Sequence, residues 1–176
     1  MGRLDIMLKF LSEITSYLES LAEANVRLHA ALKEYQNLLV MGETDAIAKA
    51  TPHLDRLTIE IRRIDENRRA FVDDFFLKMG WDGPRNFSSI AEHVKAHGVN
   101  DDEAAAFERA RIARAKLIEA LAQVDAQNSL NMTLVGQSMS FAEISLRAIL
   151  GCHDKPSTYG PSDSDGDGPA LLDAQA

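Results

Sequence analysis

The sequence contains few residues that cross-link a chain or break helices. It has one cysteine, Cys152, with five prolines and ten glycines among 176 residues. A single cysteine excludes an internal disulfide and is typical of a reducing compartment such as the cytoplasm. Several of the prolines and glycines lie beyond residue 150. Most of the chain is therefore free to form long helices.

The sequence also lacks an excess of basic residues. Its net charge is −8, whereas a nucleic-acid-binding surface needs positive charge to displace counterions from phosphates. The arginines between residues 61 and 69 alternate with acidic residues, which is typical of a solvated helix face. The first residues lack the apolar stretch of a signal peptide, and no apolar run approaches the length of a membrane span. We therefore expect a cytoplasmic protein with no nucleic-acid partner and no membrane insertion.

Apolar residues in the first forty positions recur alternately three and four residues apart, as in a packed amphipathic helix. Asn25 is the one polar member of this heptad series, which consists of Leu4, Met7, Leu11, Ile14, Leu18, Leu21, Asn25, Leu28, Leu32, Tyr35 and Leu39. The series predicts one continuous helix over about 4–40. Gly42 is expected to end it, with Thr44 as the N-cap of the next helix.

The same spacing continues between Ile47 and Phe75 and predicts a second helix over about 46–79, with Pro52 near its start. A connection as short as the one at Gly42 forces two helices into an antiparallel hairpin. The matched heptads predict that Leu18, Leu21 and Leu28 face Leu57, Ile61 and Ile64.

Two further helices are predicted beyond a break at residues 80–84. The first is short, over about 88–97, and the second is long, over about 102–150, with acidic residues at its start. The expected fold class is thus all-α, a coiled-coil-like bundle of a long antiparallel hairpin, a short helix and a third long helix. Residues 1–150 form the predicted bundle domain, and residues 151–176 form a disordered acidic tail.

No pattern in the sequence indicates an active site, a metal site or a cofactor site. His93 and His97 share a helix face, but no third ligand is suggested, and Val94 stands where a zinc-protease motif needs glutamate. Residues 163–168 resemble the start of an EF-hand loop, yet Ala174 occupies the place of its bidentate glutamate. We therefore expect no enzyme, no bound metal and no cofactor.

The second half of the last predicted helix is unusually apolar. After Asp125 it contains only two charged residues, Glu143 and Arg147. Its apolar residues form two stripes, one of Leu130, Leu134, Phe141 and Ile144 and the other of Met132, Val135, Met139, Leu146 and Leu150. Because a helix packed on one side needs a single apolar face, two stripes indicate burial on two sides.

The pattern leaves open whether other helices of the chain cover both stripes or a partner helix covers one of them. Methionines and small residues such as Gly136 suit adaptable, close packing against a partner. The candidate binding residues are Leu130, Met132, Leu134, Met139, Phe141, Ile144 and Leu146.

Three features resemble the FlgN-like flagellar export chaperones. The first is the helical hairpin closed by residues 39–47. The second is the last helix, with Asn128, Asn131 and Leu134 followed by small and apolar residues. The third is Thr158-Tyr159-Gly160-Pro161 near the C-terminus. The resemblance extends over nearly the whole chain as a loose pattern, with Tyr-Gly-Pro as its most specific element.

The resemblance implies a cytoplasmic chaperone of flagellar type III export. Such proteins bind the C-terminal helical regions of hook-associated (filament-junction) proteins and deliver them to the export gate. It further implies that the last helix binds the hook-associated protein, which we call the client. Tyr159, Gly160 and Pro161 are implied to dock to the export apparatus. The alternative from a different class is a structural helical scaffold that self-associates through its first-helix heptad seam.

Overall fold

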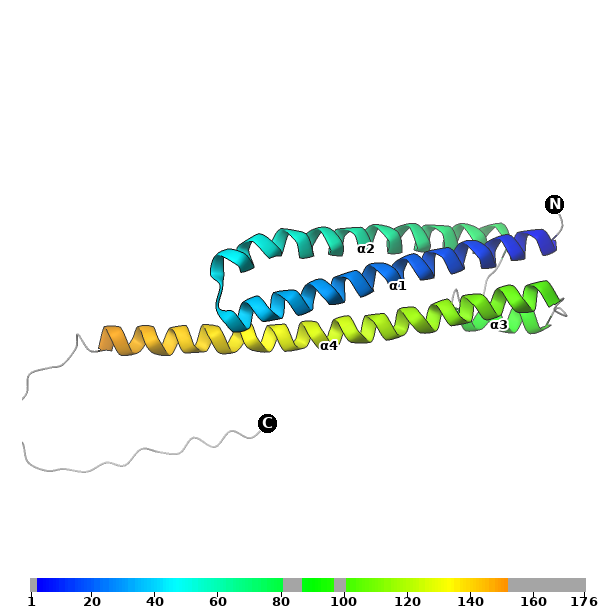
Figure 1. The fold of residues 1–176 in the computed structure, drawn as a ribbon. Coiled ribbons are helices and arrows are strands. Elements are labelled where there is room, and N and C mark those ends of the chain that lie inside the picture. The colour runs from blue at the N-terminus through cyan, green and yellow to red at the C-terminus, as the bar shows by residue number, and fades with distance from the viewer. Residues whose placement is uncertain (1–2, 81–86, 97–100, 152–176) are drawn as a thin grey trace, which may run out of the picture. The chain divides into compact units, whose positions relative to one another are not determined.

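The computed structural model describes residues 3–80, 87–96 and 101–151 of the chain. These residues form helices α1 (Arg3–Met41), α2 (Thr44–Lys78), α3 (Phe87–Ala96) and α4 (Asp101–Gly151), with no strand among them (Figure 1). The predicted all-α class is confirmed, including the long hairpin, the short helix and the third long helix. None of the described helices has the length and hydropathy needed to cross a membrane.

The chain divides into two compact units, Met1–Ser138 and Met139–Ala176, and the division falls within α4. The first unit contains α1, α2, α3 and most of α4. The described part of the second unit is the last part of α4, Met139–Gly151.

The turn between α1 and α2 is built around Gly42. Gly42 has a positive φ of 70°, a conformation that glycine adopts without steric penalty. Its N–H donates to the Leu39 carbonyl at 3.2 Å, and the Glu43 N–H donates to the Leu38 carbonyl at 3.2 Å. This pair of bonds is the Schellman pattern, which satisfies the last carbonyls of α1.

The predicted N-cap of α2 is wrong by one residue. Thr44 is the first helical residue, and Glu43 occupies the N-cap position without a side-chain capping hydrogen bond. The Schellman bonds explain the shift, because they use both Gly42 and Glu43 to close α1. Helix α2 then starts immediately, with its own backbone bond from the Ile47 N–H to the Glu43 carbonyl at 2.9 Å.

Helices α1 and α2 are antiparallel, as predicted. Arg27 of α1 forms an ion pair with Glu60 of α2 at 2.5 Å, and at the other end of the hairpin Phe10 stacks on Phe75 with ring centroids 3.7 Å apart. Leu21, the centre of the predicted interface, is buried.

The core surrounds α1, which is buried against both α2 and α4. The largest fully buried side chains of the core are Phe10, Leu11 and Phe76. Phe10 of α1 and Phe76 of α2 lie outside the predicted heptad positions. The main cluster consists of Met7, Phe10, Leu11, Ile14, Leu18, Phe75, Phe76, Ile90, Ala106, Ala110 and Ala113.

Within the first unit, α4 runs in the same direction as α1 (Figure 1). Its buried face begins with alanines, which allow two helix backbones to approach closely. This face continues with spacings of three and four residues and becomes polar toward its end. Its buried or half-buried members are Ala106, Ala110, Ala113, Leu117, Ala120, Val124, Gln127, Asn131 and Leu134.

Candidate protein-binding surfaces

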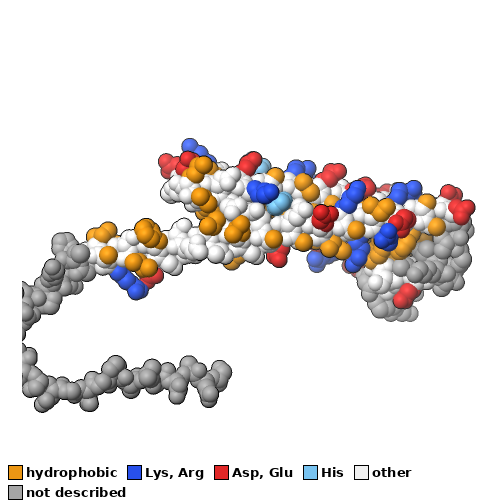
Figure 2. Space-filling model, turned by 60° about the horizontal axis from the view of Figure 1, so that its bottom comes forward, with side chains coloured by type: hydrophobic (Ala, Val, Ile, Leu, Met, Phe, Trp, Pro, Cys, Tyr) orange, Lys and Arg blue, Asp and Glu red, His pale blue; other side chains and the backbone are white. Residues whose placement is uncertain are grey.

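The end of α4 exposes its large apolar side chains. In the second unit Phe141 is 73% exposed, Met139 69% and Ile144 65%. The exposed set in this unit is Met139, Phe141, Ile144, Leu146, Ile149 and Leu150. Figure 2 shows hydrophobic groups along the segment next to the grey C-terminal trace. Glu143 and Arg147 of the same helix form an ion pair. A soluble monomer usually avoids such a cluster, which makes it a candidate interaction surface.

The three candidate residues in the first unit are in different environments. Leu130 and Met132 are 46% and 68% exposed, respectively. Leu134 is half-buried and continues the face of α4 that packs on α1. Truncating Leu134 would therefore disturb packing inside the first unit, whereas Leu130 and Met132 are available to a partner.

Two buried amides complete the α4 face that contacts α1. Asn131 donates from Nδ2 to the Leu32 carbonyl at 2.9 Å. Gln127 donates from Nε2 to Gln36 Oε1 at 2.9 Å and to Asn131 Oδ1 at 3.2 Å. Because buried polar groups need partners, these bonds define the axial position of α4 along α1.

A groove of about 710 Å³ lies between α2 and α4 in the first unit. Its floor is α1, through Ile14, Leu18, Leu21 and Asn25, and α3 contributes Phe87 and Ile90. Its α2 wall consists of Thr58, Ile61, Arg62, Asp65, Arg68, Arg69 and Val72, and its α4 wall of Arg114, Leu117, Ile118 and Leu121. Sequence reasoning missed this groove, because it exists only once α2 and α4 pack on different sides of α1.

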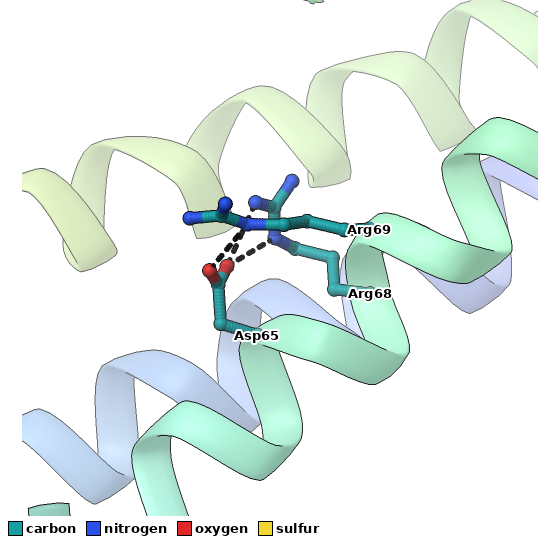
Figure 3. Close-up of polar contacts among 3 residues, drawn as sticks. All are labelled: Asp65, Arg68 and Arg69. Atoms are coloured by element: carbon teal, nitrogen blue, oxygen red, sulfur yellow. Dashed lines mark hydrogen bonds and ion pairs between the residues drawn. The ribbon is translucent and has the colours of Figure 1, made fainter.

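The α2 wall of the groove holds a compact charge cluster (Figure 3). Asp65 accepts two hydrogen bonds from Arg68, at 2.9 and 2.7 Å, and one from Arg69 at 2.7 Å. Partial burial raises the pKa of the Asp65 carboxyl, but the hydrogen bonds and positive charges of Arg68 and Arg69 outweigh it. The pKa of Asp65 is therefore lower than its ordinary value of 3.8, and the carboxylate is charged at neutral pH.

On the groove's other rim Arg114 lies over the ring of Phe87, 5.6 Å from its centroid. Phe87 in turn stacks on Phe107, with centroids 5.1 Å apart. This stack holds a guanidinium at the junction of α3 and α4, since cations are attracted to the faces of aromatic rings.

Several predicted positions lie outside the described residues. They are the proposed docking residues Tyr159, Gly160 and Pro161, the EF-hand-like residues 163–168 and His97. Within the described ranges, no three His, Cys, Asp or Glu side chains are grouped so as to hold a metal ion.

The geometry defines a class of protein: a helical bundle with a long groove in its first unit and an exposed apolar helix end in its second. The family model described as FlgN protein matches residues 7–164. The chain therefore belongs to the FlgN family of flagellar export chaperones, and the predicted resemblance is confirmed. Comparisons with curated proteins and with solved structures give no match.

Proposed function

We propose that this chain is a cytoplasmic, non-enzymatic chaperone for hook-associated proteins of the flagellum, and that it delivers them to the export gate. The observation that supports this role most directly is the exposed apolar end of α4. Phe141 and Ile144 are three residues apart, so both side chains lie on one helix face. That face is suited to an apolar helix that a client exposes before it assembles.

In this proposal α4 binds the C-terminal helical region of the client through Leu130, Met132, Met139, Phe141, Ile144 and Leu146, with Leu134 supporting the helix from its α1 side. Tyr159, Gly160 and Pro161 engage the export machinery. An affinity between micromolar and nanomolar, about −8 to −12 kcal/mol, would hold the client and still permit release.

The test uses the full chain and purified hook-associated proteins encoded by the same genome. The double substitution Phe141→Ala, Ile144→Ala should weaken client binding about thirtyfold, because truncating central anchors of an interface typically costs more than 2 kcal/mol. Calorimetric titration measures the affinity. The melting temperature should stay near that of the wild type, since both residues are exposed.

Ile59→Ala is the matched control, because Ile59 is 64% exposed on α2 and lies outside the candidate surface. It should bind the client normally. If the double variant also binds normally, the end of α4 is not the client surface.

The competing function is a scaffold that self-associates. The sequence placed its interface at the heptad seam of α1, but Leu11, Leu18 and Leu21 of that seam are buried within the chain. A self-associating scaffold would therefore use another surface, such as the exposed end of α4. Sedimentation equilibrium of the protein alone distinguishes the two: a scaffold forms a stable oligomer without a client, whereas the proposed chaperone forms a complex only when a client is added.

A further inference from the structure

The groove between α2 and α4 is lined by several arginines in addition to apolar residues, unlike the exposed end of α4. Its floor is apolar except for Asn25, and its walls combine apolar side chains with four arginines, Arg62, Arg68, Arg69 and Arg114, and one acidic residue, Asp65. We call these charged wall positions the rims of the groove. This local excess of positive charge occurs in a chain whose net charge is −8.

Much of that positive charge is not neutralised within the molecule. Asp65 is shared by Arg68 and Arg69, so one carboxylate faces two guanidinium groups. Among the described residues, no carboxylate is paired with Arg62 or Arg114. Figure 3 shows the Arg68 and Arg69 side chains extending from α2 beside the carboxylate that they share.

The groove is elongated. On α2 its lining extends from Thr58 to Val72, and on α1 from Ile14 to Asn25. At about 1.5 Å of rise per residue these stretches are roughly 21 and 17 Å long, or three to four helical turns. A volume of this size is ordinary for a ligand site, but the length of the groove along α1 and α2 matches that of another helix. On α4 the lining extends over about two turns, from Arg114 to Leu121.

The apolar lining is also incompletely covered. Ile118 is 50% exposed and Leu121 47% exposed on the α4 wall, and Ile61 is half-buried on the α2 wall. A helix placed between them would bury these side chains and form a fourth element around the α1 floor. Its flanks would then lie against the arginine rims.

We infer that this groove binds an amphipathic helix of the client whose apolar face is flanked by acidic residues. The inference rests on the proposed chaperone function, and it adds a second client contact, in the first unit, that selects partners by charge. The exposed apolar side chains of the walls, Ile118 and Leu121, provide affinity, and the rims reject helices with basic flanks, since like charges placed together in an interface are unfavourable.

The experiment compares two fluorescent synthetic peptides that share one leucine heptad seam. One has glutamates on both flanks and the other has lysines. Fluorescence anisotropy with the full chain should show binding of the glutamate peptide that weakens as salt increases, and much weaker binding of the lysine peptide. Equal binding of both peptides, or no binding of the glutamate peptide, would overturn the inference.

The groove itself is tested by the double substitution Arg62→Glu, Arg69→Glu, which reverses two rim charges two turns apart on α2. It should weaken binding of the glutamate peptide about tenfold or more. The matched control is Arg56→Glu, Arg109→Glu, which makes the same change of net charge at exposed positions outside the groove. An equal loss in both double variants would mean that net charge, not the groove, attracts the peptide.

If charge reversal lowers the melting temperature, Ile118→Ser replaces it, with Ile59→Ser as the control at another exposed isoleucine. Loss of binding in Ile118→Ser alone supports the groove, and equal binding in both contradicts it. The molar mass of the particle in solution, without peptide, should be the same for the wild type and for Arg62→Glu, Arg69→Glu. A lower mass for the double variant would assign the groove to a second copy of the chain and overturn the inference.

The experiments distinguish a failure of the proposed chaperone function from a failure of the proposed charge preference of the groove. Phe141→Ala, Ile144→Ala should leave glutamate-peptide binding unchanged, because those residues lie outside the groove. If hook-associated proteins do not bind but the glutamate peptide binds in the groove, the proposed client class is wrong and the charge preference stands. If the hook-associated proteins bind and the peptide does not, the charge preference is wrong.

Discussion

Asn128 and Asn131 lie one helical turn apart on α4 in different surroundings. Asn128 is exposed, whereas Asn131 is 3% exposed and bonds both to the Leu32 carbonyl and to Gln127. The sequence presents them as a similar pair. Burial makes only one of them a structural residue at the contact between α4 and α1.

We predict that Asn131→Ala lowers the free energy of unfolding by about 1–3 kcal/mol, because it leaves buried polar groups without their partner. Urea denaturation followed by circular dichroism measures the change. Asn128→Ala is the control and should alter the free energy of unfolding by less than about 0.5 kcal/mol. Similar values for both variants would show that the buried amide does not stabilise the α1–α4 contact.

At the scale of the element, two glycines occupy different positions in their helices, one at an end and one in the interior. Gly42 ends α1 with a φ of +70°, whereas Gly136 lies inside α4 with ordinary helical backbone. Neither position has an atom within 4 Å of an added Cβ. Substitution by alanine therefore tests backbone conformation without steric interference.

We predict that Gly42→Ala destabilises the hairpin by about 1–2 kcal/mol, since an L-residue in the left-handed region is strained. Gly136→Ala should stabilise α4 by about 0.5–1 kcal/mol, because glycine is a poor helix former. The measurement is the denaturation midpoint of each variant in urea. Destabilisation by Gly136→Ala would contradict the ordinary helical backbone and the open space around this position.

At the scale of the whole molecule, the proposed function assigns client binding and delivery to different parts of the chain. The α4 surface is helical, whereas Tyr159 lies beyond the described residues. Tyrosine is a suitable anchor for the export machinery, because its ring provides a large contact area and its hydroxyl remains polar.

We predict that Tyr159→Ala leaves client affinity unchanged and reduces the amount of client that cells export. Calorimetric titration measures the first quantity, and immunoblotting of client in the culture medium measures the second. Tyr35→Phe, a conservative change at a half-buried tyrosine of α1, should affect neither. Loss of client binding in Tyr159→Ala would contradict the separation of roles.

The sequence by itself determined the helices and the hairpin. Heptad spacing is a local property of the chain, and it identified Leu18, Leu21 and Leu57 as buried and Asn25 as a polar residue within the seam. Gly42 marked the turn correctly, because its positive φ is a requirement of the backbone. The sequence also revealed the apolar end of the last helix, because its apolar residues form two stripes and not the single face of an ordinary amphipathic helix.

Only the tertiary structure decided which surfaces are covered, since coverage depends on neighbours that are distant in sequence. It buried Phe10 of α1 and Phe76 of α2 outside the heptads, because the core cluster includes residues of all four helices. It placed Leu134 partly inside the bundle and left Phe141 exposed, although both belong to one stripe in the sequence. It also formed the arginine-rimmed groove, because α2 and α4 pack against α1 with a gap between them that neither helix fills.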